Sequence, residues 1–199
     1  MAVQTKPIDQ SYIRVYDDLV PEYLQDFFEL SILGRAGART IHPTVQFKCK
    51  YEDTAIDTNG SSPMSFYHVL KSSAENSDHF ENFYEIPRLF CKQHDLLLRE
   101  ILAARIYLIT PQKTDLAHYK PHIDFSFPHT VLLYYVNDAD GNTVFVDHNQ
   151  KVFREVEPKK GRLLAFDGSL YHGGGVPKNS ARCVVNFNIL VHSKSAPMK

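Results

Sequence analysis

The sequence predicts an α+β protein, in which helices from the first half of the chain pack on an antiparallel β-sandwich or barrel from the second half. Apolar residues recur at helical spacing after Pro21 and again from about residue 80 to residue 103. After residue 104 the pattern changes to short β-type runs separated by turn residues, without a helical pattern between them. This order favours helices that cover one face of a sheet.

The first half contains a short strand, a helix start and a loop. Residues 12–16 alternate as a strand does, and Pro21 followed by acidic residues indicates the start of a helix. From Phe80 to Ala103 the apolar positions predict one helix or two consecutive ones. Residues 50–65 are rich in Asn, Gly, Ser and Pro, which predicts a loop; closure of this loop over a site is the alternative to an ordinary surface loop.

The second half contains two strands whose two faces can be distinguished. Both faces of 130–136 are apolar or aromatic, so we expect both to be covered. In 182–191 the odd positions are wholly apolar, whereas the even positions include Arg182, Asn186 and Asn188. Either the even face lies in water, or it lines a barrel interior where the arginine needs an anion. The full set of candidate strands is 104–110, 117–124, 130–136, 143–147, 151–157, 161–167, 170–172 and 181–192.

Charge and composition exclude several classes of protein. The 199 residues include 22 Lys+Arg and 23 Asp+Glu, a formal net charge of −1, which disfavours nucleic acid and anionic membrane surfaces as partners. Hydrophobic residues make up 43% of the chain, enough for one core. The three cysteines are far apart and predict free thiols. No signal peptide or long apolar segment is recognisable, so a cytoplasmic location is the default expectation.

The strongest chemical signal is a set of three metal-ligand side chains. Residues two apart on a strand project from the same face, so His122 and Asp124 can converge on one ion. The best third ligand is His172, which follows a candidate strand and precedes three glycines. Two histidines and one carboxylate on one side of a metal form the facial triad of non-haem Fe(II) oxygenases. Arg182 lies ten residues after His172, and its guanidinium could bind a planar carboxylate in a bidentate manner.

Several segments in the second half extend this signal in a fixed order. They are 119–125 (Y-K-P-H-I-D-F), 134–137 (Y-Y-V-N), 141–145 (G-N-T-V-F), 156–166 (V-E-P-K-K-G-R-L-L-A-F) and 172–182, which begins H-G-G-G-V and ends at Arg182. Together they resemble the prolyl 4-hydroxylase branch of the Fe(II)/2-oxoglutarate dioxygenases. The resemblance covers roughly residues 104–192. It implies a double-stranded β-helix (a jelly-roll, cupin-like barrel) with supporting N-terminal helices.

The resemblance also implies how the chain is organised and what its residues do. One domain would span 1–199, with helical support at 1–103 and the β-helix core at 104–192. No catalytic residue beyond the metal ligands is implied. The implied roles are Fe(II) ligation by His122, Asp124 and His172; 2-oxoglutarate binding by Arg182, Tyr135 and Asn186, with Thr143 as a weaker candidate; and a place beside the prime substrate for Tyr119, with Tyr107 as a further lining residue.

The activity implied by the resemblance is hydroxylation with Fe(II), 2-oxoglutarate and O₂, with ascorbate as a further cofactor and succinate and CO₂ as products. The prime substrate would be a protein side chain, prolyl among them, or a small molecule. One alternative is a jelly-roll binding module with a vestigial metal site. The other is a nucleic-acid dealkylase of the same superfamily, although Val184 and Asn188 occupy places where those relatives carry Asn and Arg. The expected partners are therefore 2-oxoglutarate and the prime substrate, with neither nucleic acid nor membrane.

Overall fold

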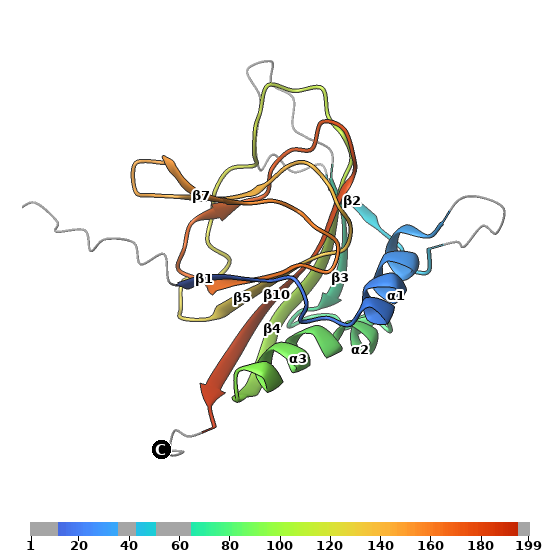
Figure 1. Ribbon diagram of the computed structural model, residues 1–199, viewed down its shortest axis with the longest axis vertical. Helices are drawn as coiled ribbons and strands as arrows, with labels where there is room; N and C mark the ends of the chain where they lie inside the picture. The colour runs from blue at the N-terminus through green and yellow to red at the C-terminus, as the bar shows by residue number, and fades with distance from the viewer. Residues whose placement is uncertain (1–11, 36–42, 51–64, 195–199) are drawn as a thin grey trace, which may run out of the picture.

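The computed structural model describes residues 12–35, 43–50 and 65–194, which form two antiparallel sheets with helices on one side (Figure 1). The larger sheet has the strand order β1-β8-β5-β10-β4-β3-β2, and the smaller has the order β7-β6-β9. The strands are β1 (Ile13–Tyr16), β2 (Lys48–Lys50), β3 (Ser65–Lys71), β4 (Leu96–Ile109), β5 (Thr130–Tyr135), β6 (Thr143–Val146), β7 (Val152–Val156), β8 (Leu163–Asp167), β9 (His172–Gly173) and β10 (Arg182–Ser193). Two antiparallel sheets with helices on the larger one confirm the predicted α+β jelly-roll class.

Three helices cover the outer face of the larger sheet: α1 (Glu22–Leu33), α2 (Phe80–Phe83) and α3 (Glu85–Gln93) (Figure 1). As predicted, α1 begins directly after Pro21, with Glu22 in its first turn. It ends at Gly34, whose φ of 68° is accessible to glycine at little cost. No described helix has the length and apolar character needed to cross a membrane.

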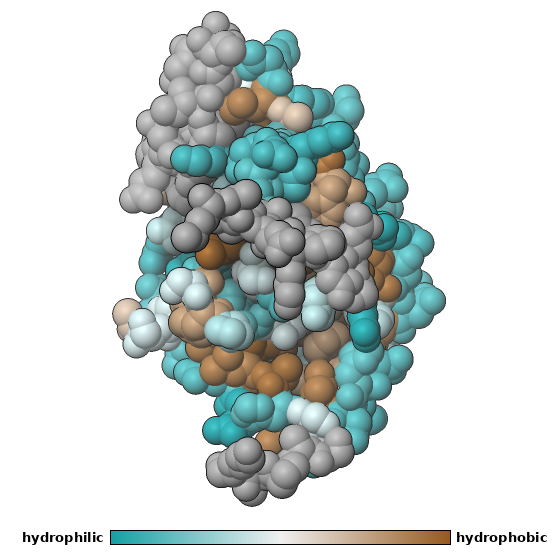
Figure 2. Space-filling model, turned by 90° about the vertical axis from the view of Figure 1, so that its left-hand side faces the viewer, coloured by the Kyte–Doolittle hydropathy of each residue, from teal (hydrophilic) through white to brown (hydrophobic). Residues whose placement is uncertain are grey.

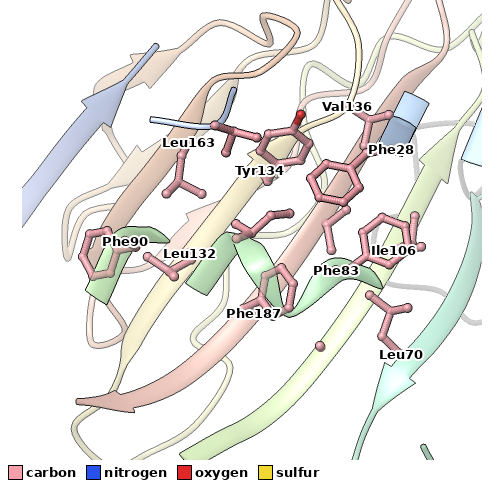
Figure 3. Packing of buried hydrophobic residues seen from close by; sticks show 14 of the residues in the cluster. Phe28, Leu70, Phe83, Phe90, Ile106, Leu132, Tyr134, Val136, Leu163 and Phe187 are labelled. Atoms are coloured by element: carbon pink, nitrogen blue, oxygen red, sulfur yellow. The ribbon is translucent and has the colours of Figure 1, made fainter. Parts of the chain in front are cut away.

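The core between the helices and the sheet is built from aromatic and aliphatic side chains (Figure 3). The Phe28 ring of α1 stacks on Phe83 at a centroid distance of 5.1 Å and meets Tyr134 edge-on at 5.6 Å. Phe187 of β10 is fully buried in the same cluster. Each such side chain contributes about 2–3 kcal/mol by leaving water, so this face supplies much of the stability of the fold.

Strands β5 and β10 lie in the middle of the larger sheet and are covered on both sides, as the sequence predicts. Residues Leu132, Tyr134 and Val136 pack toward the helices, whereas Val131, Leu133 and Tyr135 join a second cluster between the two sheets. On β10 the odd positions from Cys183 to Ile189 face the helices, and Val184 faces the interior. The even face of this strand therefore lines the barrel.

Two predicted elements differ from the structure. Residues 96–103 were expected to be helical but extend β4, because the C-terminal half of β10 offers a ladder of partners from Ser193↔Leu96 onward. Residues 117–124 were expected to form a strand, yet the chain makes only isolated bridges at His118 and His122. Pro121 lies between these bridges and has no N–H to donate to a ladder.

The region predicted as a loop is bordered by strands that the sequence analysis did not identify. Lys50 ends β2, and Ser65 begins β3, with which β2 pairs. Residues 51–64, on which the loop prediction falls, lie outside the described residues. The first 103 residues therefore contribute strands as well as helices, and the helical support predicted for 1–103 needs that correction.

Candidate metal centre

Three side chains converge between the two sheets: His122, Asp124 and His172, whose ligand atoms all lie within 4.8 Å of one another. The backbone sets the distance between the two histidines. The His122 N–H donates to the His172 carbonyl at 2.9 Å, and the His172 N–H donates to the His122 carbonyl at 3.0 Å. Gly173 follows directly and lets the chain approach the Tyr119 carbonyl, which would lie 2.7 Å from a Cβ at this position. Main-chain bonds therefore hold the backbones of the two histidines next to each other.

Both imidazoles are oriented by carbonyl groups. Nδ1 of His122 lies 3.2 Å from the Lys120 carbonyl, and Nδ1 of His172 lies 3.0 Å from the Leu170 carbonyl. With Nδ1 protonated as the donor, Nε2 of each ring keeps its lone pair for a metal. Burial lowers the pKa of His172, which favours the neutral form that binds metals.

The carboxylate of Asp124 is held from two sides. Its Oδ1 lies 3.4 Å from Nε2 of His122, and its Oδ2 accepts a hydrogen bond of 3.1 Å from Nδ2 of Asn186. Burial alone would raise the pKa of Asp124. The hydrogen bond with His122, the electrostatic interaction with the His172 ring and the Asn186 amide outweigh burial and hold this pKa below its ordinary value. The group is therefore an ionised ligand.

The centre is buried on one side and open on the other. The His172 residue is 7% exposed, whereas the side chain of His122 is 57% exposed. The Phe166 ring lies edge-on to the His172 ring at 4.7 Å and closes the inner side. Figure 2 shows apolar residues gathered on the face that lies at the left of Figure 1, bordered by hydrophilic ones. Two nitrogen ligands and one carboxylate, with one side open, suit a divalent iron ion that must also bind other molecules.

A buried cation lies further along β10. Arg182 is 2% exposed, and its Nη2 donates to Oγ1 of Thr143 at 2.8 Å. Its Nε has no hydrogen-bond partner, and none of the ion pairs among the described residues includes it. Because a buried guanidinium without an anion is costly, this site fits the carboxylate of a ligand.

Two hydroxyl groups complete the surroundings of this arginine. The Tyr135 hydroxyl donates to Oγ1 of Thr143 at 2.7 Å, and the Tyr135 ring lies 5.7 Å from the Arg182 guanidinium carbon. Burial raises the pKa of Tyr135, so its hydroxyl stays protonated and remains a donor. Thr143, the weaker candidate in the sequence, thus contacts both Arg182 and Tyr135.

Tyr119 lies at the edge of this region, 9% exposed, in a small cluster with Ile109 and Val176. Burial raises the pKa of its hydroxyl to about 12, although a hydrogen bond with Ser65 and the charge of Arg182 lower it. The structure therefore brings Tyr119 toward Arg182 and β3.

The sequence analysis assigned no role to two polar residues on the interior face. Arg105 of β4 stands opposite Asn186 of β10, and Asn188 lies two residues further along β10. The alternation of Ala103, Arg105 and Tyr107 with apolar neighbours could have placed Arg105 on this face.

Comparisons with known proteins agree with this geometry. Residues 104–190 match the sequence profile of the 2OG-Fe(II) oxygenase superfamily, which confirms the resemblance drawn from the motifs. A search of curated proteins found no match.

Solved structures show the same fold at low sequence identity. A Trichoplax adhaerens prolyl hydroxylase, in complex with a peptide fragment of the hypoxia inducible factor, has a TM-score of 0.60 and 12% identity, covering 91% of this chain and 84% of that one. The Pseudomonas putida prolyl-4-hydroxylase has a TM-score of 0.53 and 12% identity, covering 89% and 92%. The viral collagen prolyl hydroxylase of Paramecium Bursaria Chlorella virus-1, in complex with 2OG, has a TM-score of 0.53 and 13% identity, covering 89% and 95%.

Proposed function

Because residues 104–190 belong to the 2OG-Fe(II) oxygenase superfamily, we propose that this oxygenase is a hydroxylase whose Fe(II) is held by His122, Asp124 and His172. The donor set supports this assignment, since one ligand atom from each imidazole and one from the carboxylate lie within 4.8 Å of one another. Asn186 acts as the positioning residue for the carboxylate of Asp124.

The proposed 2-oxoglutarate site is formed by Arg182, Tyr135 and Thr143. The single observation that carries the proposal is the fully buried Arg182, which has no acidic partner among the described residues and lies on the same interior face as Asn186. Its guanidinium binds the far carboxylate of 2-oxoglutarate, and the Tyr135 hydroxyl donates to the same carboxylate. Asn186, for which the resemblance implied cosubstrate binding, connects this site to the metal ligands.

Fe(II) with 2-oxoglutarate and O₂ supplies the oxidising chemistry for hydroxylation, with succinate and CO₂ as products and ascorbate as a further reductant. The protein itself binds and orients the cosubstrate and shields it from water. Burial around Arg182 excludes water from the cosubstrate carboxylate, and Phe166 closes the inner side of the centre. The open side at His122 receives the prime substrate, with Tyr119 as a nearby contact.

The proposed prime substrate is a protein side chain, prolyl among them, or a small molecule. The names of the three prolyl hydroxylases with this fold support the first part of the proposal. The net charge of −1 argues against a nucleic-acid substrate. We propose a single oxygenase domain for residues 1–199.

The test measures 2-oxoglutarate binding by calorimetry without O₂, and succinate formation with Fe(II) and O₂. We expect Arg182→Gln to weaken 2-oxoglutarate binding by about 30-fold or more, corresponding to about 2 kcal/mol. His172→Ala should abolish succinate formation. Arg154→Gln, a change of an exposed arginine on β7, is the matched control and should leave both measurements unchanged. If the wild-type protein neither binds 2-oxoglutarate nor forms succinate, a jelly-roll binding module becomes the better description.

A further inference from the structure

A second arginine lies on the interior face of the larger sheet, beside the metal ligands. In the register between β10 and β4, Arg105 stands directly opposite Asn186, whose amide donates to Asp124. Directly opposed residues of antiparallel strands project from the same face of the sheet. Arg105 therefore projects to the side on which the metal ligands lie.

The cation of Arg105 has no acidic partner among the described residues. Arg162 pairs with Asp17, and Lys160 pairs with two acids, but none of these ion pairs includes Arg105. Burial raises the pKa of the neighbouring Tyr107, while the charge and hydrogen bond of Arg105 lower it and the Asp124 carboxylate raises it further. Both Arg105 and Asp124 therefore interact electrostatically with Tyr107. Arg105 is exposed, so a ligand can reach its guanidinium from solvent.

Arg105 and Arg182 are at different levels of the barrel. Arg182 pairs with Ile109, and Asn186, four residues further along β10, pairs with Arg105. Four residues of a strand span roughly 13 Å. A cosubstrate carboxylate bound at Arg182 therefore leaves Arg105 available to a different molecule.

A buried polar atom without a hydrogen-bond partner lies near Arg105. Asn188 is 4% exposed, and its Oδ1 has no hydrogen-bond partner. It stands opposite Ala103 of β4 and Val131 of β5, whose side chains offer no hydrogen-bonding group. Buried polar atoms in proteins are nearly always hydrogen-bonded, so Oδ1 of Asn188 can accept a hydrogen bond from an N–H or O–H group of a ligand. Asn188 is the diagonal neighbour of Arg105, at a Cβ separation of about 7–8 Å.

We propose that Arg105 and Asn188 form the prime-substrate subsite, and that the substrate is a carboxylate with an N–H or O–H donor close to it. This inference rests on the proposed function, because it takes the metal centre as the place of reaction. The guanidinium of Arg105 binds the substrate carboxylate, and Oδ1 of Asn188 accepts from the donor. Asn186, which donates to Asp124, stands directly opposite Arg105, so a carboxylate bound there holds the neighbouring carbon atoms near the metal ligands. A free amino acid and the C-terminal residue of a peptide both carry this chemistry.

The test uses ligand-detected NMR on protein loaded with Zn(II) and 2-oxoglutarate. The probes are the free L-amino acids, tripeptides with free C-termini, and the carboxamide of each. We expect at least one free carboxylate to bind and its carboxamide not to bind; the amino-acid and tripeptide arms identify the source of the carboxylate. Arg105→Gln should weaken this binding about tenfold or more, and Arg105→Lys should retain part of it. Arg99→Gln, a change of another exposed arginine on the same strand, is the matched control.

Three results with the carboxylate probes would overturn the inference: no carboxylate probe binds the wild-type protein, a carboxamide binds as well as its acid, or Arg105→Gln binds the probes normally. Binding of 2-oxoglutarate is measured on the same samples. If the wild-type protein binds 2-oxoglutarate but none of the carboxylate probes, the subsite is wrong and the proposed function stands. If the wild-type protein does not bind 2-oxoglutarate, the proposed function itself fails. Loss of 2-oxoglutarate binding in Arg105→Gln would assign Arg105 to the cosubstrate and also overturn the inference.

Discussion

The two faces of the larger sheet are made by the same strands but have opposite characters. The outer face buries Phe187, Leu132 and the ring of Tyr134 against the helices in a mainly apolar cluster whose described residues include no buried cation, although the Tyr134 hydroxyl has no hydrogen-bond partner among them. The inner face of the same strands carries Arg182 and Asn188, which are buried and have polar atoms without partners. Unpaired buried polar atoms each cost about 1–3 kcal/mol. The comparison teaches that the outer face stabilises the fold and that the inner face gives up stability to bind ligands.

The largest expected effect belongs to the outer face. Phe28 is fully buried, whereas the adjacent Phe27 is 42% exposed. Phe28→Ala should lower the free energy of unfolding by about 3–5 kcal/mol, since it removes a ring that contacts Phe83 and Tyr134. Phe27→Ala is the matched control, with an expected loss below about 1 kcal/mol. Denaturant unfolding measures both, and equal losses would show that the outer face is not the main source of stability.

A smaller effect of opposite sign is expected on the inner face. Asn188→Leu should raise the free energy of unfolding by about 1 kcal/mol, because an apolar side chain of similar size replaces a buried amide oxygen without a partner. The same change should weaken binding of the carboxylate probes. Asn186→Leu is the comparison: it removes the donor to Asp124, and metal affinity should fall about 10- to 100-fold. A destabilised Asn188→Leu protein would contradict the inner-face interpretation.

The smallest effect is expected at the edge of the larger sheet, where Asp17 follows β1 and Arg162 precedes β8. The hydrogen bond from Arg162 lowers the pKa of Asp17, with burial opposing it. The folded-state pKa is below the unfolded value, so this stabilisation is present above about pH 4 and is lost as the pH falls further. The Asp17 side chain is 37% exposed, so screening keeps the contribution below about 1 kcal/mol. Asp17→Asn should therefore slightly reduce the loss of unfolding free energy that the wild-type protein shows below about pH 4. If the loss is unchanged, the Asp17–Arg162 ion pair does not contribute to stability.

The sequence predicted the inner and outer faces more reliably than the ends of elements. Both faces of 130–136 are apolar or aromatic and both are covered, and the wholly apolar odd positions of 182–191 face the helices from Cys183 to Ile189, as the sequence predicts. The run after His94 contains mostly leucine and isoleucine, which fit a helix or a strand equally well. The outcome there depends on partner residues of β10 that lie 85 to 97 positions further along the chain, which no local pattern shows.

The residues of the candidate site could be predicted from their types and their order in the chain. The backbone structure that holds them together could not. His122, Asp124 and His172 were identified from their chemistry and from the resemblance, and the structure places them together. The strand geometry expected for His122 and Asp124 is absent, since Pro121 interrupts the ladder. Asn188 and Arg105 could not be connected in advance, because their proximity depends on the register between β10 and β4.

The paired main-chain hydrogen bonds between His122 and His172 have a consequence for how the protein acquires its metal ion. Since main-chain bonds hold the two histidines together and carbonyl groups orient their rings, the ligands are assembled before any ion arrives. Metal loading is then a step that follows folding and can be repeated. A chelator should empty the centre without melting the protein, and added Fe(II) should refill it without a refolding step.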